Sequence, residues 1–235
     1  MKGLTTVVRL LVTTLVAVGL ITAAVPARGD DALDARQLVD RARLTFESTI
    51  AAPEMDGLRD LIKSAKGVFV APQVLRGAFI FGVSGGSGVL VARGERPGEW
   101  TGPAFYTIGE ASFGLQAGGD ASEVVLLAMT NRGVAALLAN SLKLGADASA
   151  AAGPVGVGVR AATANLSADI LSFSRSKGLY GGISVDGAVI ATRDSLNRAY
   201  YGRDVKPADV LIRPVVTNPH AAALIEQVAR AATAK

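Results

Sequence analysis

The stretch AKGVFVAPQVLRGAFIFGVSGGSGVLVAR, residues 65–93, carries the strongest information about the fold. A partial echo, KGLYGGISVDGAVIATR, follows at residues 177–193. Both blocks run from a lysine-glycine pair through apolar and aromatic residues to a glycine-marked turn and a short apolar segment that ends in arginine. Apolar segments bounded by glycines predict short strands, here at 78–83 and 89–93, joined by a glycine-rich β-turn. Neither block contains an obvious set of catalytic side chains.

Helices are predicted on both sides of this β-rich region. Residues 30–50 place apolar side chains at helical spacing, and Pro53 starts a second short helix that ends near residue 63. The first helix carries three arginines against four acids, so we expect it to pack on the core rather than lie on a membrane. Asn218 caps a final helix. The sequence therefore predicts an α+β fold with a strongly curved antiparallel sheet or partial barrel, N-terminal helices, small inserted helices and a C-terminal helix.

Residues 1–29 have the layout of a secretory signal peptide. Lys2 and Arg9 precede an apolar run at 10–24, and small residues follow the run. The run is about five residues short of the roughly 20 that a membrane-crossing helix needs, and a retained membrane anchor is the alternative. Removal of the segment leaves residues 30–235 as one domain. We expect this domain to be exported, either periplasmic or secreted, and peripheral on a membrane.

The charge balance and the absence of cysteine exclude several classes of function. Without the basic residues of the signal segment, 21 basic residues face 20 acidic ones, whereas nucleic-acid binding needs a concentrated basic face. The lack of cysteine excludes disulfides and lipoprotein anchoring. His220 is the only histidine and cannot form a zinc site alone, and no acidic loop has calcium spacing. We therefore expect no nucleic-acid partner, no metal and no cofactor.

One motif invites a catalytic interpretation. Residues 82–86 match the G-x-S-x-G pattern, in which Ser84 would be a hydrolase nucleophile. The pattern requires a strand-turn-helix context, but the following residues read as a strand, so a hydrolase is a remote third interpretation. The same glycine-rich segment could also contact a phosphate group through its backbone amides. The residues of this predicted phosphate-contact loop are Ser84, Gly85, Gly86, Ser87 and Gly88.

Between Asp34 and Ile212 the chain resembles the SYLF-domain family in six blocks that occur in order. The blocks are Lys66-Gly67-Val68-Phe69; residues 85–93 (GGSGVLVAR) with Trp100 and Pro103; residues 113–118 (FGLQAG); residues 153–156 (GPVG); residues 172–182 (SFSRSKGLYGG); and Tyr200-Tyr201-Gly202. The resemblance implies a non-enzymatic lipid-binding module. Eukaryotic members bind phosphoinositides, and some bind actin. Exported bacterial members look like cell-envelope proteins.

The leading hypothesis is an exported protein that docks on anionic phospholipid through basic residues at turn tips and nearby aromatic residues. The rival hypothesis is a protein-interaction or assembly module of the cell envelope, with a protein partner or a homo-oligomer and no response to lipid. The predicted lipid contacts are Lys66, Phe69, Arg76, Phe81, Arg93, Trp100, Lys177, Tyr180 and Arg193.

Overall fold

The computed structural model describes residues 31–78, 81–113, 118–157, 167–176, 179–181, 185 and 187–234. The predicted signal segment, residues 1–29, lies outside these ranges. Residues 31–235 form one compact unit, and every residue of both hydrophobic cores belongs to it. A chain that begins at Asp30 therefore contains the complete described core.

The long first helix forms as the sequence predicts. Helix α2 spans Asp31–Ala51 and buries a stripe that includes Leu38, Ala42 and Phe46 at helical spacing. A short 3₁₀ turn, η1 (Pro53–Met55), and helix α3 (Asp56–Leu61) follow it. None of the described helices combines the length and the apolar character that a helix needs to cross a membrane.

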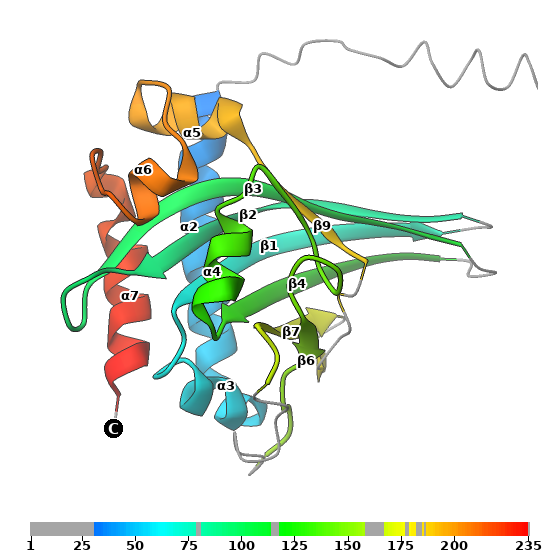
Figure 1. The fold of residues 1–235 in the computed structure, drawn as a ribbon. Helices are drawn as coiled ribbons and strands as arrows, with labels where there is room; N and C mark the ends of the chain where they lie inside the picture. The colour runs from blue at the N-terminus through cyan, green and yellow to red at the C-terminus, as the bar shows by residue number, and fades with distance from the viewer. Residues whose placement is uncertain are drawn as a thin grey trace, which may run out of the picture. The chain divides into compact units, whose positions relative to one another are not determined.

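Four long antiparallel strands form the centre of the sheet: β1 (Gly67–Ala78), β2 (Phe81–Arg93), β3 (Trp100–Phe113) and β4 (Gly118–Ala128). Short strands extend both edges: β5 (Ser141–Lys143), β6 (Ala150–Ala152), β7 (Ile170–Ser176), β8 (Leu179–Gly181) and β9 (Val189–Thr192). Within the described residues the order is β5-β9-β3-β2-β1-β4-β7-β6, with β8 beside β7. The strands curve around the core (Figure 1). The α+β prediction with a curved, mainly antiparallel sheet is confirmed.

The remaining helices complete two layers on the sheet. They are α4 (Asn131–Leu137), α5 (Asp194–Tyr201), α6 (Pro207–Leu211) and, after the turn η3 (Pro219–Ala221), α7 (Ala222–Thr233). Alternation along β1 divides the core, because Val68 and Val70 join one cluster with α2, α5 and α7, and Phe69 joins the other with α4 and α6. We call these two faces of the sheet the helix side and the cavity side.

The glycine-rich segment has a different conformation from the one predicted. Residues 84–88 lie in the middle of β2, a single long strand, and they are hydrogen-bonded neighbours of both β1 and β3. The prediction of a β-turn between two short strands was therefore wrong. The reason is packing: a Cβ on Gly86 would lie 2.2 Å from the carbonyl oxygen of Gln73, and one on Gly88 would lie 2.4 Å from the ring of Phe69. At these two positions glycine allows close approach inside the sheet rather than a turn.

A buried carboxylate holds α4 on the cavity side. Asp169 accepts hydrogen bonds from the Thr130 hydroxyl (2.6 Å) and from the amide (3.1 Å) and hydroxyl (2.9 Å) of Ser149. The Thr130 side chain in turn accepts a bond from the Gly133 amide and caps α4. These bonds, first of all the one from Thr130, hold the pKa of Asp169 below its ordinary value. The position of α4 therefore depends on an ionised Asp169.

The two adjacent glycines of β2 provide a test of the strand assignment. We expect Gly86→Ala to lower the free energy of unfolding by about 1–3 kcal/mol, because the new methyl group meets fixed backbone. Gly85→Ala is the matched control, since a Cβ there has no atom within 4 Å. It should be neutral or stabilise by up to about 1 kcal/mol. Urea unfolding measures both. Equal tolerance of the two substitutions would contradict the strand.

The Asp169 contacts predict a pH dependence. Because the folded-state pKa lies below the unfolded value of about 3.9, the stabilisation is present above that value and is lost as the pH falls through the folded pKa. Asp169→Asn should cost about 1.5–3 kcal/mol at neutral pH, and its difference from the parent should shrink below about pH 4. Asp204→Asn, which breaks only a surface ion pair with Arg198, should change stability little at either pH.

Candidate functional site

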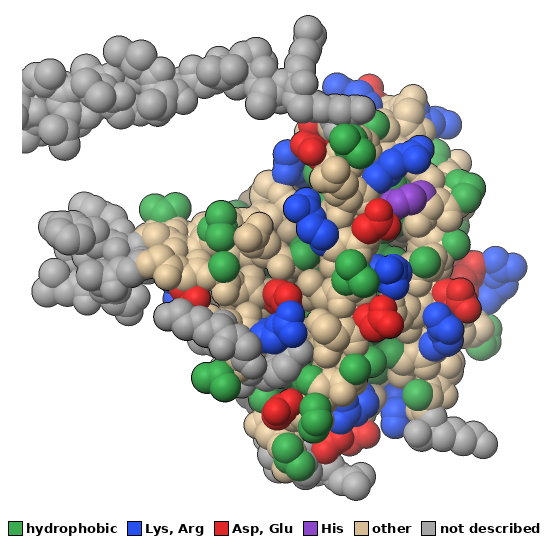
Figure 2. Space-filling view, turned by 180° about the vertical axis from the view of Figure 1, so that it is seen from behind, with side chains coloured by type: hydrophobic (Ala, Val, Ile, Leu, Met, Phe, Trp, Pro, Cys, Tyr) green, Lys and Arg blue, Asp and Glu red, His purple; other side chains and the backbone are tan. Residues whose placement is uncertain are grey.

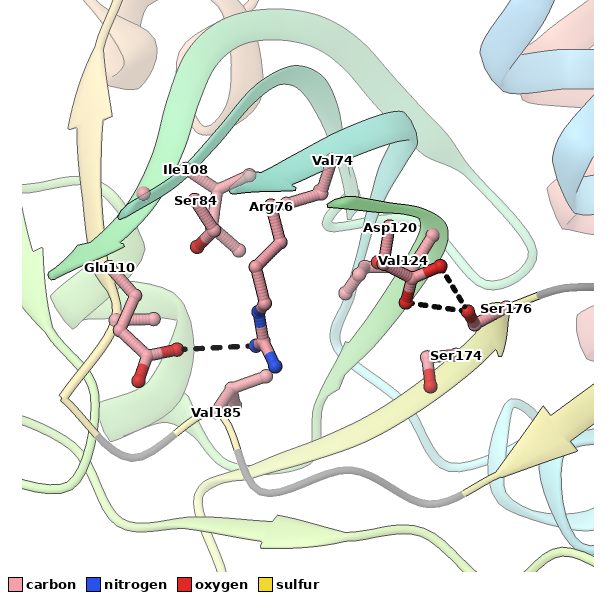
Figure 3. A pocket seen from close by; sticks show the side chains of 13 residues that line it. Val74, Arg76, Ser84, Ile108, Glu110, Asp120, Val124, Ser174, Ser176 and Val185 are labelled. Carbon is pink, nitrogen blue, oxygen red and sulfur yellow. Dashed lines mark hydrogen bonds and ion pairs between the residues drawn. The ribbon is translucent and has the colours of Figure 1, made fainter. Parts of the chain in front are cut away.

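At the outer ends of β1 to β4, charged and uncharged residues lie on opposite faces of the sheet. The register aligns Arg76 with Asp120 on β4 and with Ser84 on β2, and it aligns Ser84 with Glu110 on β3. All four residues line one cavity on the cavity side of the sheet (Figure 3). Successive residues of a strand point to opposite faces, so the uncharged residues between them lie on the helix side.

The charged residues largely satisfy one another inside this cavity. Arg76 forms an ion pair with Glu110 at 3.7 Å, and the Ser176 hydroxyl donates to both oxygens of Asp120 at 2.8 and 2.7 Å (Figure 3). The cavity holds about 90 Å³, which is room for about three water molecules and far below the roughly 300 Å³ of a small ligand site. We therefore interpret it as a polar network between strand ends, in which the Arg76 side chain stays about half exposed.

The opposite face of the same strand ends is uncharged. One row across the sheet runs Val189, Gly109, Gly85, Leu75 and Ala121, from β9 through β3, β2 and β1 to β4. The next row outward contains Val83, Gly77 and Gly119. We call these eight residues the glycine face. The exposed face of a half-covered sheet usually carries polar residues, whereas this face carries none at these eight positions.

The glycine face is exposed. Leu75 is 55% and Val83 is 62% exposed, and Val189 is also exposed. In Figure 1 the outer ends of β1 to β4 extend beyond α2 and α7, and in Figure 2 uncharged side chains dominate this end of the sheet. A Cβ on Gly77 or Gly85 would meet no atom within 4 Å, so packing inside the chain does not require glycine there. The face is an apolar surface with few side chains, which a neighbour can approach closely.

Two arginines border the glycine face on the side nearer the helices. Arg41 of α2 shares a groove with Leu75, Gly85 and Ser87. Arg193, which precedes α5, donates a 2.7 Å hydrogen bond to the Ser87 hydroxyl. Among the described residues neither arginine forms an ion pair with a carboxylate. The surface thus consists of an apolar end and two arginines without a carboxylate partner. The arginines lie near Ser87, about two residues or 7 Å from Gly85 along β2.

The structure divides the predicted lipid contacts into separate groups. Arg193 lies beside the glycine face, and Arg76 lies on the other side of the same strand ends with Glu110 as its partner. Lys66 and Arg93 lie at the opposite end of β1 and β2. Phe81 and Tyr180 are placed on β2 and β8 by their backbone only, and Lys177 lies outside the described residues.

Two of the predicted aromatic contacts belong to the core instead. Phe69 is fully buried on the cavity side and packs edge-to-face on Tyr106 with ring centres 6.3 Å apart. Trp100 is buried on the helix side beneath the Arg93 guanidinium, whose carbon lies 4.9 Å from the ring centre. The prediction that these rings are available at the surface was wrong, because both occupy strand positions that face a hydrophobic layer.

The predicted phosphate-contact loop does not form. Ser84, Gly85, Gly86, Ser87 and Gly88 are part of β2, whose neighbours β1 and β3 pair with both of its edges, so these residues do not form a free loop around an anion. Two of its residues still border the surfaces described above: Ser84 lines the polar cavity, and Ser87 anchors Arg193. The hydrolase interpretation also loses its geometry, because His220 contacts Tyr200 and Asp40 rather than Ser84.

Sequence reasoning missed Leu75, Val83, Val189 and Arg41. In the sequence, apolar Leu75 and Val83 are each followed by a polar residue, Arg76 and Ser84. Such alternation predicts that the two residues of each pair lie on opposite faces of a strand. The usual rule then puts the apolar member inside. Only the three-dimensional arrangement shows that at this end of the sheet the charged members face the cavity.

Comparison with known proteins places the chain in a family. The model of the family described as "Ysc84: Las17-binding protein actin regulator" matches residues 109–231. LAS seventeen-binding protein 3 of Saccharomyces cerevisiae is 33% identical over 162 residues, which are 66% of this chain and 35% of that protein. Protein YSC84 of the same yeast is 32% identical over 170 residues, 70% of this chain and 36% of that protein.

A human protein is also similar to this chain. SH3 domain-containing YSC84-like protein 1 is 31% identical over 153 residues, 64% of this chain and 44% of the human protein. The chain therefore spans less than half the length of each of these relatives. The family match covers the last residues of β3, all of β4 and the helices from α4 to most of α7. This chain belongs to the Ysc84 family, which confirms the resemblance to SYLF domains seen in its sequence.

Proposed function

We propose that this protein is an exported, non-enzymatic lipid-binding protein that docks on anionic phospholipid, and that the glycine face is its membrane contact. The observation that carries the proposal is the separation of residue types at the ends of β1 to β4: the charged residues line a cavity on one face, and the exposed Leu75 and Val83 lie on the opposite face, whose neighbouring strand positions are uncharged. Arg41 and Arg193, which have no carboxylate partner among the described residues, supply the complementary charge for lipid phosphates.

The expected strength of this contact is modest. Each exposed aliphatic side chain gains roughly 1 kcal/mol when it enters hydrocarbon, and each arginine near an anionic surface gains about 1 kcal/mol. Three aliphatic residues and two arginines together supply a few kcal/mol, comparable to a single myristoyl anchor, which binds membranes reversibly. The proposed protein is therefore peripheral. Binding depends on anionic lipid and weakens as salt screens the charges.

Export is the part of this proposal that rests on the sequence alone, through the signal-like residues 1–29. The non-enzymatic character rests on the site. Ser84, the one candidate nucleophile from the motif search, has Arg76 and Glu110 as neighbours in its cavity and no imidazole base there. Nucleophilic serines in hydrolases need such a base within hydrogen-bond reach.

The family description supports a second candidate function. Relatives of this chain are named for binding Las17, and the family is described as an actin regulator. An exposed apolar strand face can dock a protein as well as a bilayer. In that case the chain is a protein-interaction module without lipid binding, and a protein partner or a second copy covers the glycine face.

Fluorescent labels on the glycine face separate these candidates. The chain has no cysteine, so Leu75→Cys or Val83→Cys gives one labelled site. Leu44→Cys and Val215→Cys are matched controls, because Leu44 is 54% exposed and Val215 is 62% exposed. The protein should begin at Asp30, because the apolar residues 10–24 would bind lipid themselves. With anionic vesicles we expect a blue shift and quenching by spin-labelled lipid at positions 75 and 83, but not at 44 and 215.

The outcomes of this experiment differ between the candidates. Failure to sediment with vesicles at any lipid composition would remove the lipid-binding proposal. Sedimentation without a response from positions 75 and 83 would keep lipid binding and move the contact elsewhere. A blue shift that depends on protein concentration and needs no lipid would favour a second copy.

A charge reversal tests the arginine border. Arg41→Glu should weaken vesicle binding about tenfold or more at low salt, because it removes one attractive charge and adds a repulsive one. Arg203→Glu is the control, because Arg203 is also exposed and forms no ion pair among the described residues. Equal losses for both variants would show a general charge effect and contradict a specific border at Arg41.

A further inference from the structure

A groove lies where α2 packs on the helix side of β1 and β2. It holds about 180 Å³, which is room for about six water molecules and less than the roughly 300 Å³ of a site for a drug-sized ligand. Two polar residues, Gln73 and Ser87, are register partners on the same face as Leu75 and Gly85. The groove therefore runs from the glycine face to two polar side chains. Its lining residues are Leu38, Arg41, Pro72, Gln73, Leu75, Gly85, Gly86 and Ser87.

A fixed arginine lies at the polar end of this groove. The Arg193 guanidinium donates a 2.7 Å hydrogen bond to the Ser87 hydroxyl. Its backbone is held on both sides, because the Arg193 amide donates to the Phe105 carbonyl at 2.9 Å and the Arg193 carbonyl accepts from the side chain of Asn197 at 3.2 Å. Asn197 is fully buried and also bonds the amide and the carbonyl of Phe105. The guanidinium is therefore held beside Ser87 before any ligand arrives, which lowers the entropic cost of binding.

A second arginine approaches the same hydroxyl from another element. Arg41 is exposed and lines the groove from α2, whose turn at this point is anchored by the buried Leu38. The side-chain amide of Gln73 forms no hydrogen bond within the described part of the chain, and it lies across the strand pair from Ser87. Two guanidinium groups, a hydroxyl and an amide thus gather at one end of the groove.

No carboxylate neutralises the two arginines. Neither forms an ion pair in the part of the chain that the structure describes, and the acids next to them in sequence have other partners. Asp40 lies 3.3 Å from His220, and Asp194 pairs with Lys206 at 3.5 Å. Asp34 lies two helical turns, or about 10 Å, before Arg41. Paired guanidinium groups with neutral donors beside them are the groups that proteins use to bind phosphate oxygens.

We infer that this end of the groove binds one phosphate monoester, held by Arg41, Arg193, Ser87 and Gln73. A monoester carries about 1.5 to 2 negative charges at pH 7 and three acceptor oxygens, whereas a diester carries about one charge on two free oxygens. Two fixed guanidinium groups therefore select the monoester.

The phosphate belongs to a lipid head group rather than to a dissolved molecule, because the groove opens on Leu75 of the glycine face. The acyl chains of such a lipid would lie over the glycine face while its phosphate lies beside Ser87. This choice of source rests on the proposed docking of the glycine face. The phosphate site itself does not, since its donors are in place without a membrane.

Dissolved esters test the site in the absence of lipid. Calorimetry titrates the protein from Asp30 onward with methyl phosphate and with dimethyl phosphate at neutral pH and constant ionic strength. We expect saturable binding of methyl phosphate and roughly tenfold weaker binding of dimethyl phosphate. Arg193→Gln and Arg41→Gln should each weaken methyl phosphate binding roughly fivefold, because each removes one of the two charges. Arg203→Gln is the control, since Arg203 is exposed and lies outside the groove.

Vesicles test the source of the phosphate. Phosphatidic acid is a monoester and phosphatidylglycerol is a diester, so vesicles of each are prepared at contents that give the same zeta potential. We expect roughly fivefold tighter binding to the phosphatidic acid vesicles. Arg193→Gln should abolish this preference, and Arg203→Gln should retain it.

The outcomes separate the phosphate site from the docking proposal. The inference is overturned if methyl phosphate does not bind saturably, if dimethyl phosphate binds as tightly, or if Arg203→Gln costs as much as Arg193→Gln. Equal binding to the two vesicle types would overturn the lipid as the source and leave the docking of the glycine face intact. Methyl phosphate binding without binding to any vesicle would support the phosphate site and remove the docking proposal.

Discussion

The alternation of side chains along β1 to β4 is the constraint on which the rest of this structure depends. The outer end of each strand carries a charged or polar residue, and the antiparallel register brings Arg76, Ser84, Glu110 and Asp120 into one cross-strand row. Once that row faces the cavity, the neighbouring residues have to face the other way. A one-residue slip of β1 alone would move Arg76 to the glycine face and leave Glu110 without its partner.

Because the strands are long, their inner and outer halves lie in different environments. The inner halves are covered on both sides, by α2, α5 and α7 on one face and by α4 and α6 on the other. The outer halves extend past the helices, so their stability comes from the ladders and the polar cavity rather than from a second layer (Figure 1). The glycine face follows from this division, because it lies at the outer end that no helix covers.

Much of the fold was predictable because it depends on local pattern. The helix at 30–50, the curved sheet and the C-terminal helix each have a clear period or capping signal. The conformation of residues 84–88 was not predictable from these signals, because glycine permits turns and close strand packing alike. The contacts that decide between them, such as Gly88 against Phe69, join residues about twenty positions apart. The predicted site residues were scattered in the structure for the same reason. Basic and aromatic residues were identifiable by type, but their burial and their partners depend on the register.

Folding alone does not account for the glycines of the outer face. Glycine in a strand loses more backbone entropy than alanine does, so a strand without close neighbours gains stability when glycine is replaced. Gly86 and Gly88 have close neighbours, and their lack of a side chain is a packing requirement. Gly77 and Gly85 have none, yet they lie between the exposed residues Leu75 and Val83. A stability cost without a packing reason is expected where a surface must stay flat for something outside the chain. Glycine therefore occurs in this sheet for two different reasons. Only the glycines that face outward, without close neighbours, mark a site of contact.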